Sequence, residues 1–112
     1  MILLEKQLEK YQPYNEQEEK DLMVIQKLLA QESDIFERSC LFAHMTASAW
    51  VVNWEKTKVL MAYHKIYDSW AWLGGHADGE RDLLKVAVKE VKEESGVVHV
   101  RPLLDNPFSI EV

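Results

Sequence analysis

The stretch that decides the fold is GGHADGERDLLKVAVKEVKEESGV, which runs from Gly74 to Val97. It begins with two glycines, continues through a short polar loop and becomes a helical pattern. We expect this helix to run from Asp82 to Ser95 and to end at Gly96 in a left-handed conformation. Three carboxylates lie within it at positions i, i+3 and i+4: Glu90, Glu93 and Glu94. Residues at these spacings share one face of a helix, so the three side chains can converge on one point.

A helical wheel separates this segment into three zones. The first, expected to face a sheet, contains Leu84, Val88 and Val91; the second, expected to face solvent, contains Lys85, Lys89 and Lys92. The third contains the three glutamates together with Leu83, Val86 and Ala87. Like charges so placed repel by roughly 0.2–0.5 kcal/mol per pair, and a merely solvated acidic face would interleave its Glu with Lys. The pattern therefore favours a bound divalent cation, and an all-oxygen set suits Mg²⁺ or Mn²⁺.

Composition narrows the class of protein. The 112 residues allow one domain with a helical preface, and 47% hydrophobic with 29% charged residues indicates a soluble globular chain. The net charge of −6 argues against binding to duplex nucleic acid. One cysteine, Cys40, fits a reducing compartment, and no run approaches the roughly 20 apolar residues of a membrane span. We expect a cytoplasmic protein with no membrane partner.

The remaining pattern predicts an α/β (α+β) chain. A short helix is expected over residues 2–11, and a second over 16–31 with Asn15 as its N-cap and Glu18 completing a capping-box pattern. Strands are expected over 44–52, 59–64, 70–73, 97–103 and 108–112. We assign residues 1–40 to an N-terminal helical extension packed on the domain and residues 41–112 to the domain itself.

The stretch from Lys89 to Val97 resembles the right half of the Nudix hydrolase signature, R-E-U-x-E-E-x-G-U with U an aliphatic residue. It matches with one change, Lys89 for the arginine. Counting back along the motif places its first glycine on Gly75 and its first glutamate on Arg81, with Glu80 one residue early. The change to Lys89 keeps the charge of this helix-orienting position but loses the planar guanidinium.

The resemblance implies a Nudix-like α/β/α sandwich with a mixed sheet and a metal-dependent hydrolase of a nucleoside diphosphate linked to another moiety. It implies that Glu90, Glu93 and Glu94 hold Mg²⁺ or Mn²⁺, and we take Glu93 or Glu94 as the candidate general base. Candidate contacts to a nucleotide-type substrate are Gly74, Gly75, His76, His64 and Lys65. For His76, a hydrogen bond that stabilises its own loop is the alternative.

The resemblance also leaves questions open. The family continues with further strands and a closing helix, whereas only a short segment follows Gly96 here, so we expect the C-terminal part of the domain to be missing. A fragment, a homodimer that completes the fold, and a degenerate relative are the three interpretations. The last of these gives the alternative function, a non-catalytic Nudix-like module that binds a nucleotide or a partner protein.

Overall fold

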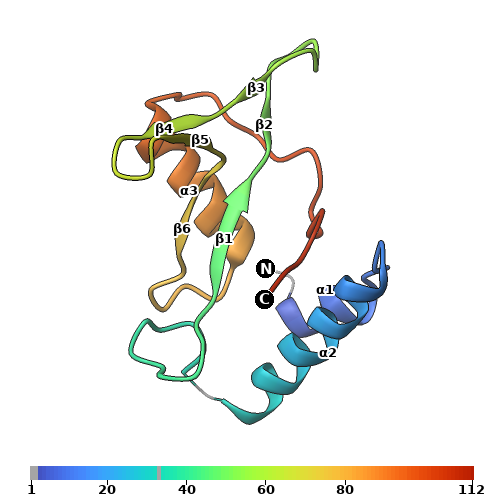
Figure 1. Cartoon of the computed structure of the whole chain (residues 1–112). Coiled ribbons are helices and arrows are strands. Elements are labelled where there is room, and N and C mark those ends of the chain that lie inside the picture. The colour runs from blue at the N-terminus through green and yellow to red at the C-terminus, as the bar shows by residue number, and fades with distance from the viewer. Residues whose placement is uncertain (1–2, 33) are drawn as a thin grey trace.

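Among the described residues, two helices come first, a run of short strands follows, and a further helix comes after the strands (Figure 1). The computed structural model describes residues 3–32 and 34–112. Within them the elements are α1 (Leu4–Glu9), α2 (Glu16–Gln31), β1 (Thr46–Ala49), β2 (Val51–Val52), β3 (Val59–Leu60), β4 (Ala62–His64), β5 (Ser69–Ala71), β6 (Leu73–His76) and α3 (Leu83–Ser95). The predicted α+β class is confirmed at this level.

The two N-terminal helices form largely as the sequence predicts. Helix α2 begins where Asn15 caps it, because the Asn15 side chain accepts a hydrogen bond from the Glu18 N–H at 2.8 Å. Helix α1 is shorter than the predicted 2–11, and its predicted start at Ile2 lies outside the described residues. None of the described helices is both long and apolar enough to cross a bilayer.

The strands pair as three separate two-stranded antiparallel sheets, β1–β6, β2–β3 and β4–β5. In the first, Thr46 lies opposite His76 and Ala49 opposite Leu73. The long strand predicted over 44–52 is divided at Trp50, where the chain leaves β6 as its partner and pairs with β3. A mixed sheet was expected; among the described residues every strand pair is antiparallel.

Helix α3 covers one face of the β1–β6 pair (Figure 1). Val86 of α3 belongs to the same buried cluster as Leu4, Leu8, Ile35, Phe36 and Ala77, and Ala47 of β1 packs against that cluster. On the opposite face of β1, Thr46 and Ser48 are exposed. The β1–β6 pair is therefore a helix-on-sheet layer, and the core reaches from α1 through residues 35–36 to the start of α3.

The strands predicted over 97–103 and 108–112 are wrong, because residues 97–112 contain no strand. Only the last part of this segment lies near α1 and α2 (Figure 1), where helix side chains bind some of its backbone groups. Gln7 donates from Nε2 to the Asp105 carbonyl at 2.9 Å, and the Ile110 N–H donates to Glu18 Oε2 at 3.2 Å. A strand needs a neighbour to pair with, and here the backbone groups pair with side chains.

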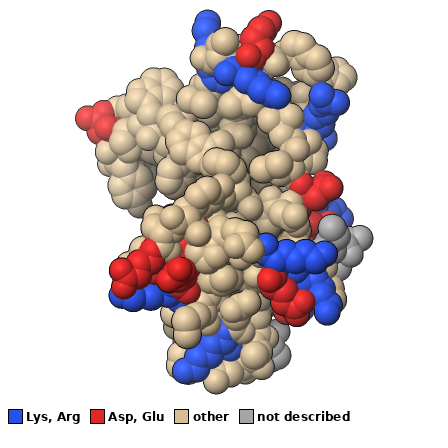
Figure 2. Space-filling model, turned by 90° about the vertical axis from the view of Figure 1, so that its right-hand side faces the viewer, with Lys and Arg blue, Asp and Glu red and all other residues tan. Residues whose placement is uncertain are grey.

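The surface charge is mixed rather than sorted by sign. On the face drawn in Figure 2, basic and acidic side chains lie in adjoining groups, separated by broad uncharged areas. With a net charge of −6, this face shows no basic stripe of the kind that tracks a phosphate backbone.

Glu18 joins α2 to the residues before it and to the C-terminal segment through one buried carboxylate. Its Oε1 accepts from the Tyr11 hydroxyl at 2.8 Å and from the Tyr14 N–H at 3.0 Å, and its Oε2 accepts from the Ile110 N–H. Burial alone would raise the pKa of Glu18, but the three hydrogen bonds outweigh it and hold this pKa below the ordinary value. Burial and the hydrogen bond to Glu18 raise the pKa of Tyr11. The carboxylate thus ties α2 to the chain on both sides of it.

Replacing Glu18 should therefore lower stability and change its pH dependence. Glu18→Ala leaves three donors without their acceptor and should cost about 1–3 kcal/mol in the free energy of unfolding. A lowered folded-state pKa gives stabilisation that is present above the unfolded pKa of about 4.3 and is lost as the pH falls through the lower folded value. Urea unfolding between pH 7 and pH 3 measures both effects. Glu19→Ala, at an exposed position on the same helix, is the matched control, and an equal loss in that variant would contradict this account.

Candidate functional site

The site begins at the contact between strand β6 and helix α3. A Cβ added to Gly75 would lie 2.6 Å from Glu90 Cδ and 2.8 Å from each Glu90 carboxylate oxygen. These distances are far inside van der Waals contact, so only glycine at position 75 leaves room for this carboxylate. Glu90 is consequently held against the bare backbone of the strand and is only half exposed.

Glu94, one turn further along α3, reaches the neighbouring glycine. Its Oε1 accepts a hydrogen bond from the Gly74 N–H at 2.9 Å. Gly74 also needs to lack a side chain, because its Cβ would lie 2.5 Å from Ser48 Cβ and 2.7 Å from the Ala47 carbonyl oxygen of β1. Other atoms thus approach the backbone closely at both glycines, which lie in strand β6. Two of the three predicted carboxylates converge on it.

The third carboxylate, Glu93, points elsewhere. Its Oε1 lies 3.9 Å from Lys89 Nζ, and the side chains of both residues are more than half exposed. The sequence prediction kept the lysines in a zone separate from the glutamates, and for Lys89 this is wrong, since residues at i and i+4 adjoin on a helix. Lys89, predicted to orient the helix, pairs with Glu93.

The wheel predicted the buried stripe of α3 only in part: Val91 is buried as expected, whereas Leu84 and Val88 are not. The buried residues are Val86, Ala87 and Val91, so the arc that faces the strands is the one that carries Glu90. Leu84 and Val88, predicted to face a sheet, instead line an open hollow of 610 Å³ together with lysines of the helix and Pro102. A helical wheel gives only the directions of side chains relative to one another. Which side of α3 faces the strands depends on the glycines of β6, against which Glu90 packs.

Two of the predicted carboxylates provide oxygen donors that suit a divalent cation. Glu90 and Glu94 offer carboxylate oxygens, the donor type that Mg²⁺ and Mn²⁺ prefer, beside a cradle at Gly75 that a Cβ would fill. This pair fits a hard cation, whereas Glu93 would join it only by leaving Lys89. Across residues 3–32 and 34–112, the one trio whose ligand atoms lie within 4.8 Å of one another is Glu32, Asp34 and Cys40. The spacing of that trio gave no signal in the sequence.

Glu80 is engaged at the start of α3. It accepts a hydrogen bond from the Asp82 N–H at 3.1 Å and lies 3.5 Å from Lys85 Nζ. The hydrogen bond from Asp82 is the main reason that the pKa of Glu80 is lowered. Glu80, which lies one residue before the position of the motif's first glutamate, therefore binds groups at the start of α3.

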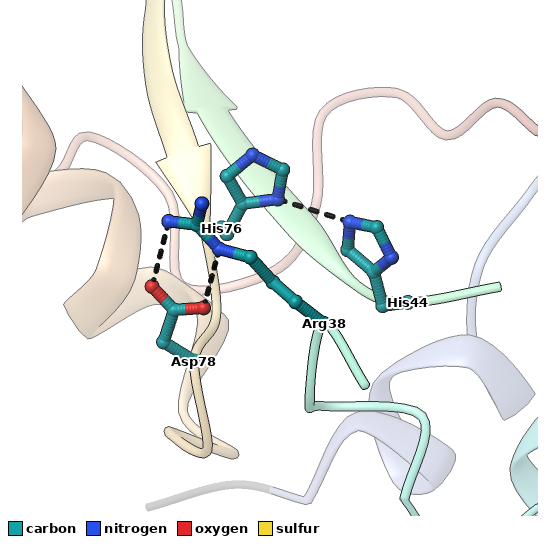
Figure 3. Close-up of polar contacts among 4 residues, drawn as sticks. All are labelled: Arg38, His44, His76 and Asp78. Carbon is teal, nitrogen blue, oxygen red and sulfur yellow. Dashed lines mark hydrogen bonds and ion pairs between the residues drawn. The ribbon is translucent and has the colours of Figure 1, made fainter. Parts of the chain in front are cut away.

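The histidines and Lys65 occupy two different places. The His76 ring, at the end of β6, lies with its Nδ1 3.0 Å from His44 Nε2, so one imidazole donates to the other (Figure 3). The two residues are 32 positions apart, so this bond joins the end of β6 to the segment before β1 and is not the bond within its own loop that was the alternative for His76. His64 and Lys65 are exposed on the β4–β5 hairpin, where the His64 ring packs edge-on against Tyr67.

Comparison with known proteins adds no relative: no protein-family model matches the chain, and no curated protein matches it.

Replacing each glycine by alanine in turn should distinguish an effect on metal binding from an effect on the stability of the sheet. Gly75→Ala should displace the flexible end of Glu90 and weaken divalent-metal binding while leaving the melting temperature nearly unchanged. Gly74→Ala meets backbone and Cβ atoms of β1 and should lower the free energy of unfolding by about 1–3 kcal/mol, the usual cost of overpacking. Mn²⁺ titration and thermal unfolding of both variants measure this. The account is contradicted if Gly75→Ala proves the less stable of the two and binds Mn²⁺ as the wild type does.

Proposed function

We propose that this protein is a metal-dependent hydrolase of a nucleoside diphosphate linked to another moiety, built on a Nudix-like unit formed by β1, β6 and α3. One observation carries the proposal: Glu90 and Glu94 both reach the consecutive glycines Gly75 and Gly74. A pair of carboxylates one helical turn apart, packed against bare backbone, supports the role that the motif resemblance implies for them. The full α/β/α sandwich is part of the proposal.

In this proposal Glu90 and Glu94 hold the cation, and Glu93 joins them once it leaves Lys89. A bound Mg²⁺ or Mn²⁺ would neutralise charge on phosphoryl oxygens and lower the pKa of a coordinated water. Glu94 keeps one oxygen on the Gly74 N–H, and a carboxylate has acceptor sites to spare for a second partner. The diphosphate would bind beside the cation, near Gly74 and Gly75 of β6, with His76 at the end of that strand. Glu93 or Glu94 serves as the general base.

The alternative is a Nudix-like module that binds a nucleotide or a partner protein without turnover. Two observations favour it: Glu93 pairs with Lys89, and Glu80 is engaged at the helix start. A screen of nucleoside diphosphate derivatives with Mg²⁺ or Mn²⁺, measuring released phosphate or nucleotide, decides between them. Hydrolysis of one class supports the enzyme, whereas metal binding without turnover of any compound supports the module.

Glu94→Gln tests the assignment without disturbing the fold. The glutamine keeps an oxygen that accepts from the Gly74 N–H, so the melting temperature should stay close to that of the wild type. It loses the negative charge that a metal ligand needs, and loss of several kcal/mol of charge stabilisation corresponds to a fall in kcat of roughly 100-fold or more. Glu19→Gln on α2 is the control and should retain activity. Full turnover by Glu94→Gln would sink the proposed mechanism.

A further inference from the structure

The segment between α2 and β1, which we call the wall (residues 35–45), packs against the turn that leads into α3. The Gly79 N–H donates to the Phe36 carbonyl at 2.8 Å, and the Ala77 N–H donates to the Met45 carbonyl at 3.0 Å. A Cβ on Gly79 would lie 2.8 Å from Glu37 Oε1. Two stretches far apart in the chain are therefore fitted closely to each other.

The turn itself has an unusual backbone. The Glu80 N–H donates to the Ala77 carbonyl at 3.0 Å, and the two residues between them have positive φ, 46° at Asp78 and 90° at Gly79. Positive φ at both central positions defines a type I′ turn, for which Asp-Gly is a preferred pair. The turn joins β6, which carries Gly74 and Gly75, to α3, which carries the glutamates. Its shape therefore sets how the two glycines meet Glu90 and Glu94.

Arg38, which belongs to the wall, forms an ion pair with Asp78 of this turn. Its Nε and one terminal nitrogen donate to the two Asp78 oxygens at 2.8 and 2.9 Å, as the paired dashed lines of Figure 3 show. Isolated surface ion pairs contribute little, but a two-pronged guanidinium–carboxylate pair also fixes geometry. The hydrogen bond to Asp78, and after it the charges of Asp78 and Glu90, raise the pKa of Arg38.

We propose that Arg38 is a positioning residue for the Glu90–Glu94 site and acts through Asp78 and the turn. It supplies, from outside the motif, the planar guanidinium that Lys89 lacks. Lys89 has its amine on Glu93 instead, and an ammonium cannot form the two-pronged contact. This inference rests on the proposed function, because it assumes that the two glutamates hold a divalent cation.

The test is a Mn²⁺ titration followed by calorimetry on the full chain, with Asp78→Asn beside Arg38→Ala. Asparagine tolerates the left-handed conformation of position 78, so this variant removes the ion pair and keeps the turn. Losing a group that supports metal ligands typically costs 10–100-fold in affinity, so each single variant should bind Mn²⁺ roughly 10-fold or more weakly. Because both changes break one contact, the double variant should be no weaker than either. Arg101→Ala, which removes an arginine stacked on Trp54, is the matched control and should bind as the wild type does.

Hydrogen exchange of the Gly79 amide gives a second readout that needs no metal. Its bond to the Phe36 carbonyl should open more readily in Arg38→Ala and in Asp78→Asn, and exchange should be faster in both than in Arg101→Ala. If the wild type binds Mn²⁺ and Arg38→Ala binds it with the same affinity, the positioning role is overturned and the proposed function stands. Additive losses of affinity in the double variant have the same consequence. Absence of Mn²⁺ binding by the wild type overturns both.

Discussion

The structure depends on the approach of a strand without side chains to a helix that carries carboxylates. At Gly75 a single methyl group would occupy the space of the Glu90 carboxylate, and at Gly74 the exposed N–H of the strand is capped by Glu94. At Gly75 such a group would displace the flexible end of Glu90, whereas at Gly74 it would meet backbone and Cβ atoms of β1. The same contact packs α3 onto the sheet and brings the carboxylates of Glu90 and Glu94 to consecutive glycines, so the packing of the fold and the chemistry of the site have a common origin.

That contact is stabilised from the other end of the chain. The core joins α1 and residues 35–36 to Ala77 and Val86, and the turn at Asp78 and Gly79 lies against Phe36 and Arg38. Residues 35–38 therefore hold the turn between β6 and α3, and α1 with residues 35–36 covers the core. Glu18 extends this arrangement by binding the segment that follows α3.

Local signals in the sequence predicted local structure well. The Asn15 cap, the bounds of α2 and α3 and the left-handed Gly96 all follow from neighbouring residues, and the structure confirms them. The strands after Gly96 did not form, because propensity cannot supply a pairing partner. The side of α3 that faces the strands could not be predicted either, since it depends on where the glycines of β6 lie. The contact of Arg38 with Asp78 joins residues 40 positions apart and leaves no trace in spacing.

The most direct test of the central claim is a Mn²⁺ titration observed by NMR. Paramagnetic broadening falls off steeply with distance from the ion, so it locates the ion along the chain. Our account predicts that the amide signals of Gly74 and Gly75 and of the last turn of α3 broaden first, and that Glu90→Gln combined with Glu94→Gln removes the effect. Broadening centred on Glu32, Asp34 and Cys40, or none at the glycines at any Mn²⁺ concentration, would contradict the account.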